Sequence, residues 1–301
     1  MTSSDRVGMV ALAMRTRFDQ FGKQLLRSAL EGRGVVETDA EISVDTRRSD
    51  VWFTPGPNGD EAVGYLGLLD RMTRSASTVE LFHATPGGDE LAGCVIKHGD
   101  FRHQLSLRKV PPQVPMQWVI SSGRPTSGIE GLWLRPMASW PSGIYEGPPL
   151  LWTRLVVVSE LPVDQDTLLV RLLGADGVLK QAIKELEALG ADDQRSMLAR
   201  PILIRLRLEI PADPADQTID EQDFLMTTQD IVEVYDRNLI ETGVKRTLVS
   251  FYEARFGAMP KDLRVAIDEM HDESTLSSWT TLMATCTADE VATVIRAVRR
   301  R

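Results

Sequence analysis

The stretch TVELFHATPGGDELAGCVIKHGDFRHQLSLRKVPPQVPMQWVIS, residues 78–121, decides the fold class of this chain. Residues 78–83 predict a strand, residues 88–109 a helix that Thr85 or Asp89 can cap, and residues 116–121 a buried strand. A strand, a helix and a strand in succession indicate an α/β arrangement of layers.

The residues before this stretch predict more of the same sheet. Residues 15–31 have the apolar spacing of an amphipathic helix, and residues 35–44 and 49–53 predict strands. Residues 60–76 predict a short helix between the second and third strands. The expected order is therefore helix, strand, strand, short helix, strand, helix, strand, with one mixed sheet.

Beyond the sheet the pattern becomes helical. Residues 123–150 are rich in Gly, Pro and Trp and predict a loop, residues 151–162 predict a strand, and residues 164–190 and 193–208 predict helices, the second bent at Pro201.

Two prolines and an acidic run mark a domain boundary at PADPADQTIDEQ. We expect a domain over residues 1–210, a linker over 211–222, and an all-helical C-terminal region over 223–301. Amphipathic helices without chemistry of their own favour packing on a partner, and a homodimer through the C-terminal helices is one such arrangement.

The composition excludes several classes of protein. The net charge is −9, and residues 211–301 carry 10 basic against 17 acidic groups, so no domain has the basic excess of a dedicated nucleic-acid binder. We expect neither a transmembrane helix nor a signal peptide. Cys94 and Cys286 lie far apart, which fits a reducing cytoplasm, and no cluster has the spacing of a zinc site. Phosphate-binding loops, dinucleotide fingerprints and nucleophile elbows are absent.

Two acidic residues are the remaining candidates for chemistry. Asp50 opens the strand SDVWF, and Glu80 lies in the strand VELFH. On adjacent strands the two carboxylates would converge at one edge of the sheet, where they could bind Mg²⁺ together with water and phosphate. The spacing alone also fits two solvated carboxylates at the rim of a sheet.

Several motifs resemble the PD-(D/E)XK nuclease superfamily, most closely the bacterial Rpn-type recombination-promoting, transposase-like nucleases. The motifs are FDQFGKQLL, SDVWFTP, VELFHATP, WVISSGRP and YEARFGAMPKDLR. The resemblance implies a restriction-endonuclease-like α-β-β-β-α-β core and Mg²⁺- or Mn²⁺-dependent cleavage of DNA. It also implies that Asp50 and Glu80 bind the metal ion and that Asp19 supplies an accessory acidic ligand.

The lysine of the superfamily motif is missing from its usual position. Phe82 stands two residues after Glu80, and a phenyl ring can neither donate a hydrogen bond nor hold water. His83 or Lys97 could replace the lysine. We favour Lys97, on the following helix, because strand alternation places His83 on the sheet face opposite Glu80.

Other polar and aromatic residues near these positions allow two interpretations. His98 and His103 flank Lys97, and we expect surface or half-buried imidazoles without a metal. Arg47 and Arg48 could contact phosphate or form ordinary surface ion pairs. The tryptophans at 118, 133, 140 and 152 could stack on bases, but we favour core packing for them.

Three functions remain at this point. The first is a Mg²⁺-dependent deoxyribonuclease with Asp50, Glu80 and Lys97 as catalytic residues. The second is a catalytically degenerate relative that acts through protein–protein association, which Phe82 and the acidic composition favour. The third, a small-molecule enzyme with its site in residues 123–150, has no catalytic constellation to support it.

Overall fold

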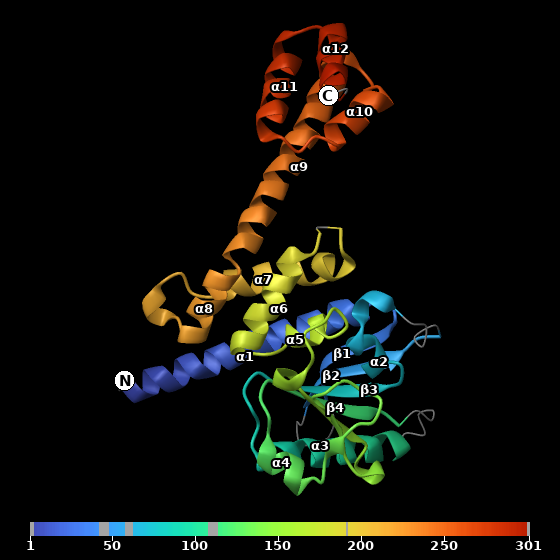
Figure 1. Cartoon of the computed structure of the whole chain (residues 1–301), viewed down its shortest axis with the longest axis vertical. Coiled ribbons are helices and arrows are strands. Elements are labelled where there is room, and N and C mark those ends of the chain that lie inside the picture. Colours follow the sequence, from blue (N-terminus) through green and yellow to red (C-terminus); the bar gives the residue numbers. More distant parts are fainter. Residues whose placement is uncertain (1–2, 42–47, 58–62, 108–113, 191, 300–301) are drawn as a thin grey trace. The chain divides into compact units, whose positions relative to one another are not determined.

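The structure is a computed structural model, and the part of the chain that it describes is residues 3–41, 48–57, 63–107, 114–190 and 192–299 (Figure 1). Arg47 lies outside the described residues. The chain divides into two compact units, Met1–Gln229 and Asp230–Arg301, and each is described by itself.

A seven-stranded mixed sheet forms the centre of the first unit as far as it is described, with the spatial order β1-β2-β3-β4-β7-β6-β5. The strands are β1 (Gly34–Glu41), β2 (Arg48–Pro55), β3 (Ser77–Phe82), β4 (Met116–Ser121), β5 (Arg135–Pro136), β6 (Ile144–Glu146) and β7 (Thr153–Val157). The first three strands pair antiparallel, β3, β4 and β7 are parallel, and β5 and β6 pair antiparallel beside β7. The predicted α/β class with a mixed sheet is confirmed.

Helices lie on both sides of this sheet (Figure 1). The α-helices of the first unit are α1 (Ser3–Leu30), α2 (Leu68–Met72), α3 (Gly88–Leu107), α4 (Thr126–Gly131), α5 (Leu168–Arg171), α6 (Asp176–Ala188), α7 (Gln194–Glu209) and α8 (Ile219–Thr227). Short 3₁₀ turns occupy Gly64–Leu66, Pro149–Leu151, Val158–Glu160 and Pro214–Asp216.

The two long helices α1 and α3 cover opposite faces of the antiparallel strands. A Cβ atom added to Gly22 of α1 would lie 2.8 Å from Leu81 Cδ1, so Leu81 faces α1. On the other face, Thr78 Oγ1 lies 3.1 Å from His98 Nδ1 of α3. Because side chains alternate along a strand, Glu80 lies on the α3 face together with Thr78.

Several predicted elements differ from the structure. Residues 123–150 are not merely a loop, because they contain α4, β5 and β6. The helix predicted over 164–190 is broken after α5, where Gly174 N donates to Arg171 O and Asp176 has a positive φ of 49°. In α7 the helix continues through Pro201.

The second unit is helical throughout its described residues. It comprises most of α9 (Gln229–Phe256), with α10 (Lys261–Asp268), α11 (Glu273–Thr285) and α12 (Ala288–Arg299). Leu248, Leu263, Trp279 and Ile295 are buried together in its core. The described residues of this region are helical, as predicted, and α9 runs through Gly243 without a break.

The boundary between the units lies later than the predicted linker at 211–222. Only residues 211–217 form a connection, because α8 begins at Ile219 with a capping box between Thr218 and Glu221. The first unit extends through this helix to Gln229. In the described part of the chain, no helix has the length and apolar character that crossing a membrane requires.

Candidate functional site

Three carboxylates form a row across β1, β2 and β3. The pairing of Val51 with Val79, continued by one residue, places Asp50 opposite Glu80. Asp39 lies opposite Asp50 on the other side, between the paired residues Thr38–Val51 and Ala40–Ser49. Side chains directly opposite on antiparallel strands share a face and have Cβ atoms about 4.5–5.5 Å apart. Val51 and Val79, the last pair of these two strands, thus stand next to Asp50 and Glu80, and the charge of Asp50 acts on the carboxyl of Glu80.

Asp50 is held at the centre of this row. Its Oδ2 accepts a hydrogen bond of 2.8 Å from the backbone N–H of Leu81, and its Oδ1 lies 3.2 Å from Lys23 Nζ. The first contact ties the side chain to β3, and the second ties it to α1. Two fixed contacts hold the carboxylate in one orientation, as a ligand or catalytic group requires.

Lys23 is a member of the site that the sequence did not reveal. Its Nζ lies 2.7 Å from Asp19 Oδ2 and 2.8 Å from Asp39 Oδ1, besides its contact with Asp50. Lys23 is only 5% exposed. Burial alone would lower its pKa, but the hydrogen bonds to Asp19 and Asp39 and the charge of Asp50 outweigh it, so the pKa is raised. The spacing Asp19–Lys23, four residues apart in FDQFGKQLL, was the available signal.

Asp19, predicted as an accessory metal ligand, binds Lys23 through one carboxylate oxygen. Burial raises its pKa, the hydrogen bond from Lys23 opposes that shift, and the charges of Asp50 and Asp39 add to it. Asp19 and Asp50 are therefore linked by Lys23, whose ammonium group contacts both carboxylates.

Glu80 and Lys97 form the other end of the site. Lys97 Nζ forms an ion pair with Glu80 Oε2 and donates a 2.9 Å hydrogen bond to the backbone carbonyl of Arg48. Glu80 is 4% exposed, and within the described structure its buried Oε1 has no hydrogen-bond partner. Burial raises the pKa of Glu80 to about 7; the charge of Lys97 opposes this shift and that of Asp50 adds to it. Burial thus favours the protonated form of Glu80, and its unpaired Oε1 is a position where a water molecule or an ion could bind.

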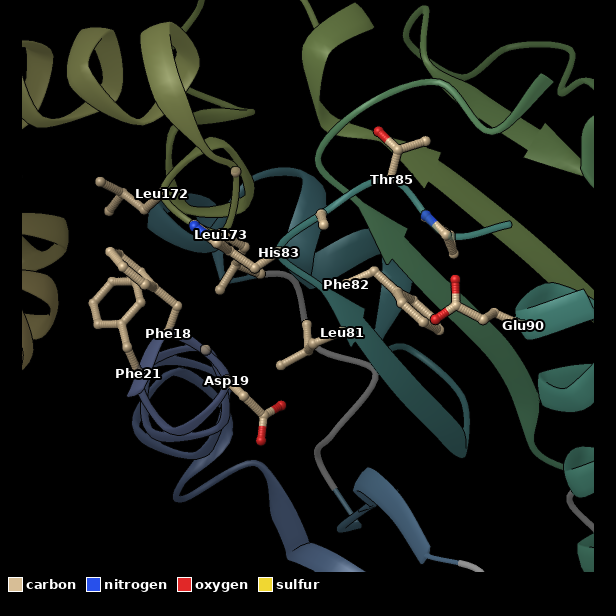
Figure 2. A pocket seen from close by; sticks show the side chains of 14 residues that line it. Phe18, Asp19, Phe21, Leu81, Phe82, His83, Thr85, Glu90, Leu172 and Leu173 are labelled. Carbon is tan, nitrogen blue, oxygen red and sulfur yellow. The ribbon is translucent and has the colours of Figure 1, made fainter. Parts of the chain in front are cut away.

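Two pockets adjoin these residues. The β3-end pocket, about 300 Å³, lies between α1, the end of β3 and the turn after α5, and Asp19 is on its wall (Figure 2). The α3 pocket, about 360 Å³, contains Glu80 and Lys97. Phe82 and Glu90 line both pockets, so they form the border between them.

The other proposed replacement for the lysine points away from Glu80. His83 stacks on Phe18 of α1 with ring centroids 4.2 Å apart and an interplanar angle of 7°. Burial lowers its pKa to about 4, and the charge of Asp176 opposes the shift. His83 therefore contributes a neutral ring to the β3-end pocket (Figure 2).

The flanking histidines and the tryptophans have mixed environments. His98 is buried, contrary to the expectation of a surface or half-buried position, whereas His103 is exposed. Trp118 is buried and donates to Met72 O, as expected for core packing. Trp133 is 71% exposed, so core packing is wrong for this residue. Both cysteines are free.

Comparison with known proteins gives no match: neither a family model, nor a curated protein, nor a solved structure matches this chain. Within the described residues, no group of three or more His, Cys, Asp or Glu is arranged to hold a metal ion.

Proposed function

We propose that the first unit is a Mg²⁺- or Mn²⁺-dependent endonuclease that hydrolyses phosphodiester bonds in DNA. The observation that carries this proposal is the meeting of Asp50, Glu80 and Lys97 from β2, β3 and α3. The order α1, β1, β2, α2, β3, α3, β4 supports it, since apart from the short α2 it corresponds to the α-β-β-β-α-β core of restriction-endonuclease-like and Rpn-type enzymes.

The donor set fits a hard divalent cation. Asp50 and Glu80 offer carboxylate oxygens on one face of the sheet, and Glu80 Oε1 is buried without a hydrogen-bond partner within the described residues. Mg²⁺ is commonly held by one or two carboxylates together with water and substrate phosphate. When bound, such an ion would polarise the phosphoryl group and lower the pKa of an attacking water molecule.

The residues of the chain have distinct roles in this proposal. Asp50 and Glu80 bind the cation, and Lys97 stabilises the negative charge that develops on the phosphoryl oxygens. Lys23, with Asp19 and Asp39 around it, orients Asp50. Arg48 is exposed at the start of β2 and is available to the DNA backbone.

The alternative, a degenerate relative that acts through protein association, rests on Phe82. The geometry weakens it, because the ammonium group of Lys97 reaches Glu80 from α3 even though Phe82 is not a lysine. Self-association through the C-terminal helices and a cytoplasmic location stay predictions.

The test is cleavage of plasmid and single-stranded DNA by the full chain, with Mg²⁺, with Mn²⁺ and with EDTA. The variants are Asp50→Ala, Asp50→Asn and Glu80→Gln, and Asp192→Asn, an exposed carboxylate, is the matched control. We expect metal-dependent cleavage by the wild type and the control, and none by the three site variants, with circular dichroism unchanged. Cleavage that persists in EDTA or in all three site variants contradicts the proposal, and so does a folded wild type that cleaves nothing.

A further inference from the structure

We infer that the β3-end pocket binds an unpaired nucleobase beside the scissile phosphate, so that the enzyme acts on single-stranded or locally unpaired DNA. The inference deepens the proposed function and rests on it for the position of the phosphate. It assigns to Phe82 the stacking surface for the base.

The first argument is position. Glu80 and Phe82 point to the same face of β3, and two residues of strand separate them by about 6.6 Å. The Phe82 ring lines the α3 pocket, which contains Glu80 and Lys97, and also the β3-end pocket. A nucleotide whose phosphate lies at Lys97, beside Glu80, therefore has its base next to Phe82.

The second argument is the character of the walls. Aromatic rings of Phe18, Phe82 and His83 line the pocket, together with the aliphatic side chains of Leu81 and Leu173 (Figure 2). A pocket of about 300 Å³, whose walls are polar and apolar in nearly equal measure, has room for a small planar ligand. Every base presents a flat face that stacks on such rings.

The third argument is charge. The polar side chains of the pocket are Asp19, Glu90, Thr85 and the neutral imidazole of His83. One oxygen of Asp19 binds Lys23 and one of Glu90 accepts from Gly87 N, which leaves each carboxylate a second oxygen. Carboxylates repel phosphate but accept hydrogen bonds from the amino groups of bases. The pocket thus favours a base, while the phosphate stays with Lys97.

These features limit the substrate. A base that is paired and stacked in a duplex cannot enter a pocket beside the backbone unless it leaves the stack. That cost is smallest for a single strand or a mismatch. Phe82 then has a function of its own at the position where the superfamily motif has lysine, and α3 supplies the cation instead.

The experiment measures binding without cleavage, in EDTA and in Ca²⁺. The probe is an oligonucleotide carrying 2-aminopurine, whose fluorescence falls on stacking, used as a single strand and in a fully paired duplex. The proteins are the full chain, Phe82→Ala, Phe82→Leu and Asp50→Asn. Phe251→Ala, which removes a half-exposed ring from the second unit, is the matched control.

We expect the wild type to bind the single strand more tightly than the duplex and to quench the probe, and Phe251→Ala to do the same. Asp50→Asn, which lacks a cation ligand, is expected to quench the probe but to lose any gain in affinity that Ca²⁺ gives. Phe82→Ala is expected to weaken single-strand binding about 5- to 100-fold and to abolish quenching. Phe82→Leu, which retains an apolar side chain without a flat face, is expected to bind without quenching. Equal affinity for single strand and duplex, or quenching that survives in both Phe82 variants, overturns the inference.

The two proposals fail in distinguishable ways. If bases stack on Phe82 but no metal-dependent cleavage occurs, the proposed nuclease activity is refuted and the proposed base site is retained. The opposite result is metal-dependent cleavage that is as fast on duplex as on single strands and is unchanged by substitution of Phe82. That result refutes the base site and retains the nuclease activity.

Discussion

Replacing Lys23 by methionine tests the electrostatic organisation of the site. Methionine keeps the length of the apolar side chain but removes the ammonium group, which lies 2.7, 2.8 and 3.2 Å from oxygens of Asp19, Asp39 and Asp50. Three carboxylates would then share one region without their common cation. Like charges left together in this way repel one another and destabilise the fold.

The magnitude follows from burial. Removing one partner of a buried ion pair costs about 3–5 kcal/mol. Lys23 is buried but its three partners keep partial access to water, so we expect the low end, about 3 kcal/mol of unfolding free energy. For a unit of this size that corresponds to about 6–12 °C in Tm.

The assay is urea denaturation followed by tryptophan fluorescence, since five of the six tryptophans lie in the first unit. Lys180→Met is the control, because Lys180 and Asp223 form an ion pair in which both side chains are more than one-third exposed. We expect the control to lose at most about 1 kcal/mol. A Lys23→Met protein as stable as Lys180→Met would refute the reasoning.

Three further predictions concern catalysis, pH and backbone geometry. Lys97→Met is expected to lower the cleavage rate at saturating Mg²⁺ about 10²–10³-fold while Mn²⁺ still binds, as measured by single-turnover kinetics and calorimetry; an unchanged rate excludes the assigned role. Burial lowers the pKa of His98 from 6.5 to about 4. Between these two pH values the folded protein keeps His98 neutral, whereas the unfolded chain takes up a proton there. The contribution of His98 to the free energy of unfolding is therefore full above pH 6.5 and is lost as the pH falls toward 4. Urea titrations should show about 2 kcal/mol of this loss between pH 7 and pH 5, absent in His98→Gln and retained in His103→Gln. Gly67 has a φ of +52°, and an added Cβ would lie 2.2 Å from Asp166 O, so Gly67→Ala should destabilise by more than about 2 kcal/mol; Gly190→Ala, with open space around it, should not, and equal melting temperatures would contradict this.

The secondary-structure elements that could be predicted are those marked by side-chain periodicity and turn residues within their own stretch of sequence. The strand, helix and strand of residues 78–121 follow from side-chain periodicity and from turn residues at their ends, and the structure has them within two residues of the predicted bounds. The break after α5 was missed because the apolar pattern continues across it. The short strands β5 and β6 were missed because two or three residues carry no periodicity.

Some residues of the candidate site could likewise be predicted from the sequence, and others could not. Asp50 and Glu80 could be paired from the order of strands, because antiparallel neighbours bring opposite residues together. The place of Lys23 in the site could not be predicted in this way. Its partners Asp39 and Asp50 lie on two strands that come next to α1 only in the folded structure. A single lysine on a helix is ordinarily a solvated residue, and nothing in its own neighbourhood distinguishes it except Asp19.

The four carboxylates of the site also bear on how many metal ions the proposed nuclease would bind. Asp19, Asp39, Asp50 and Glu80 carry four negative charges when ionised, and Lys23 and Lys97 carry two positive charges. The deficit of two charges equals that of one divalent cation, and a second ion would reverse the sign of the cluster. Lys23 already neutralises part of the charge of three of these four carboxylates, so the proposed nuclease is expected to bind one metal ion per chain.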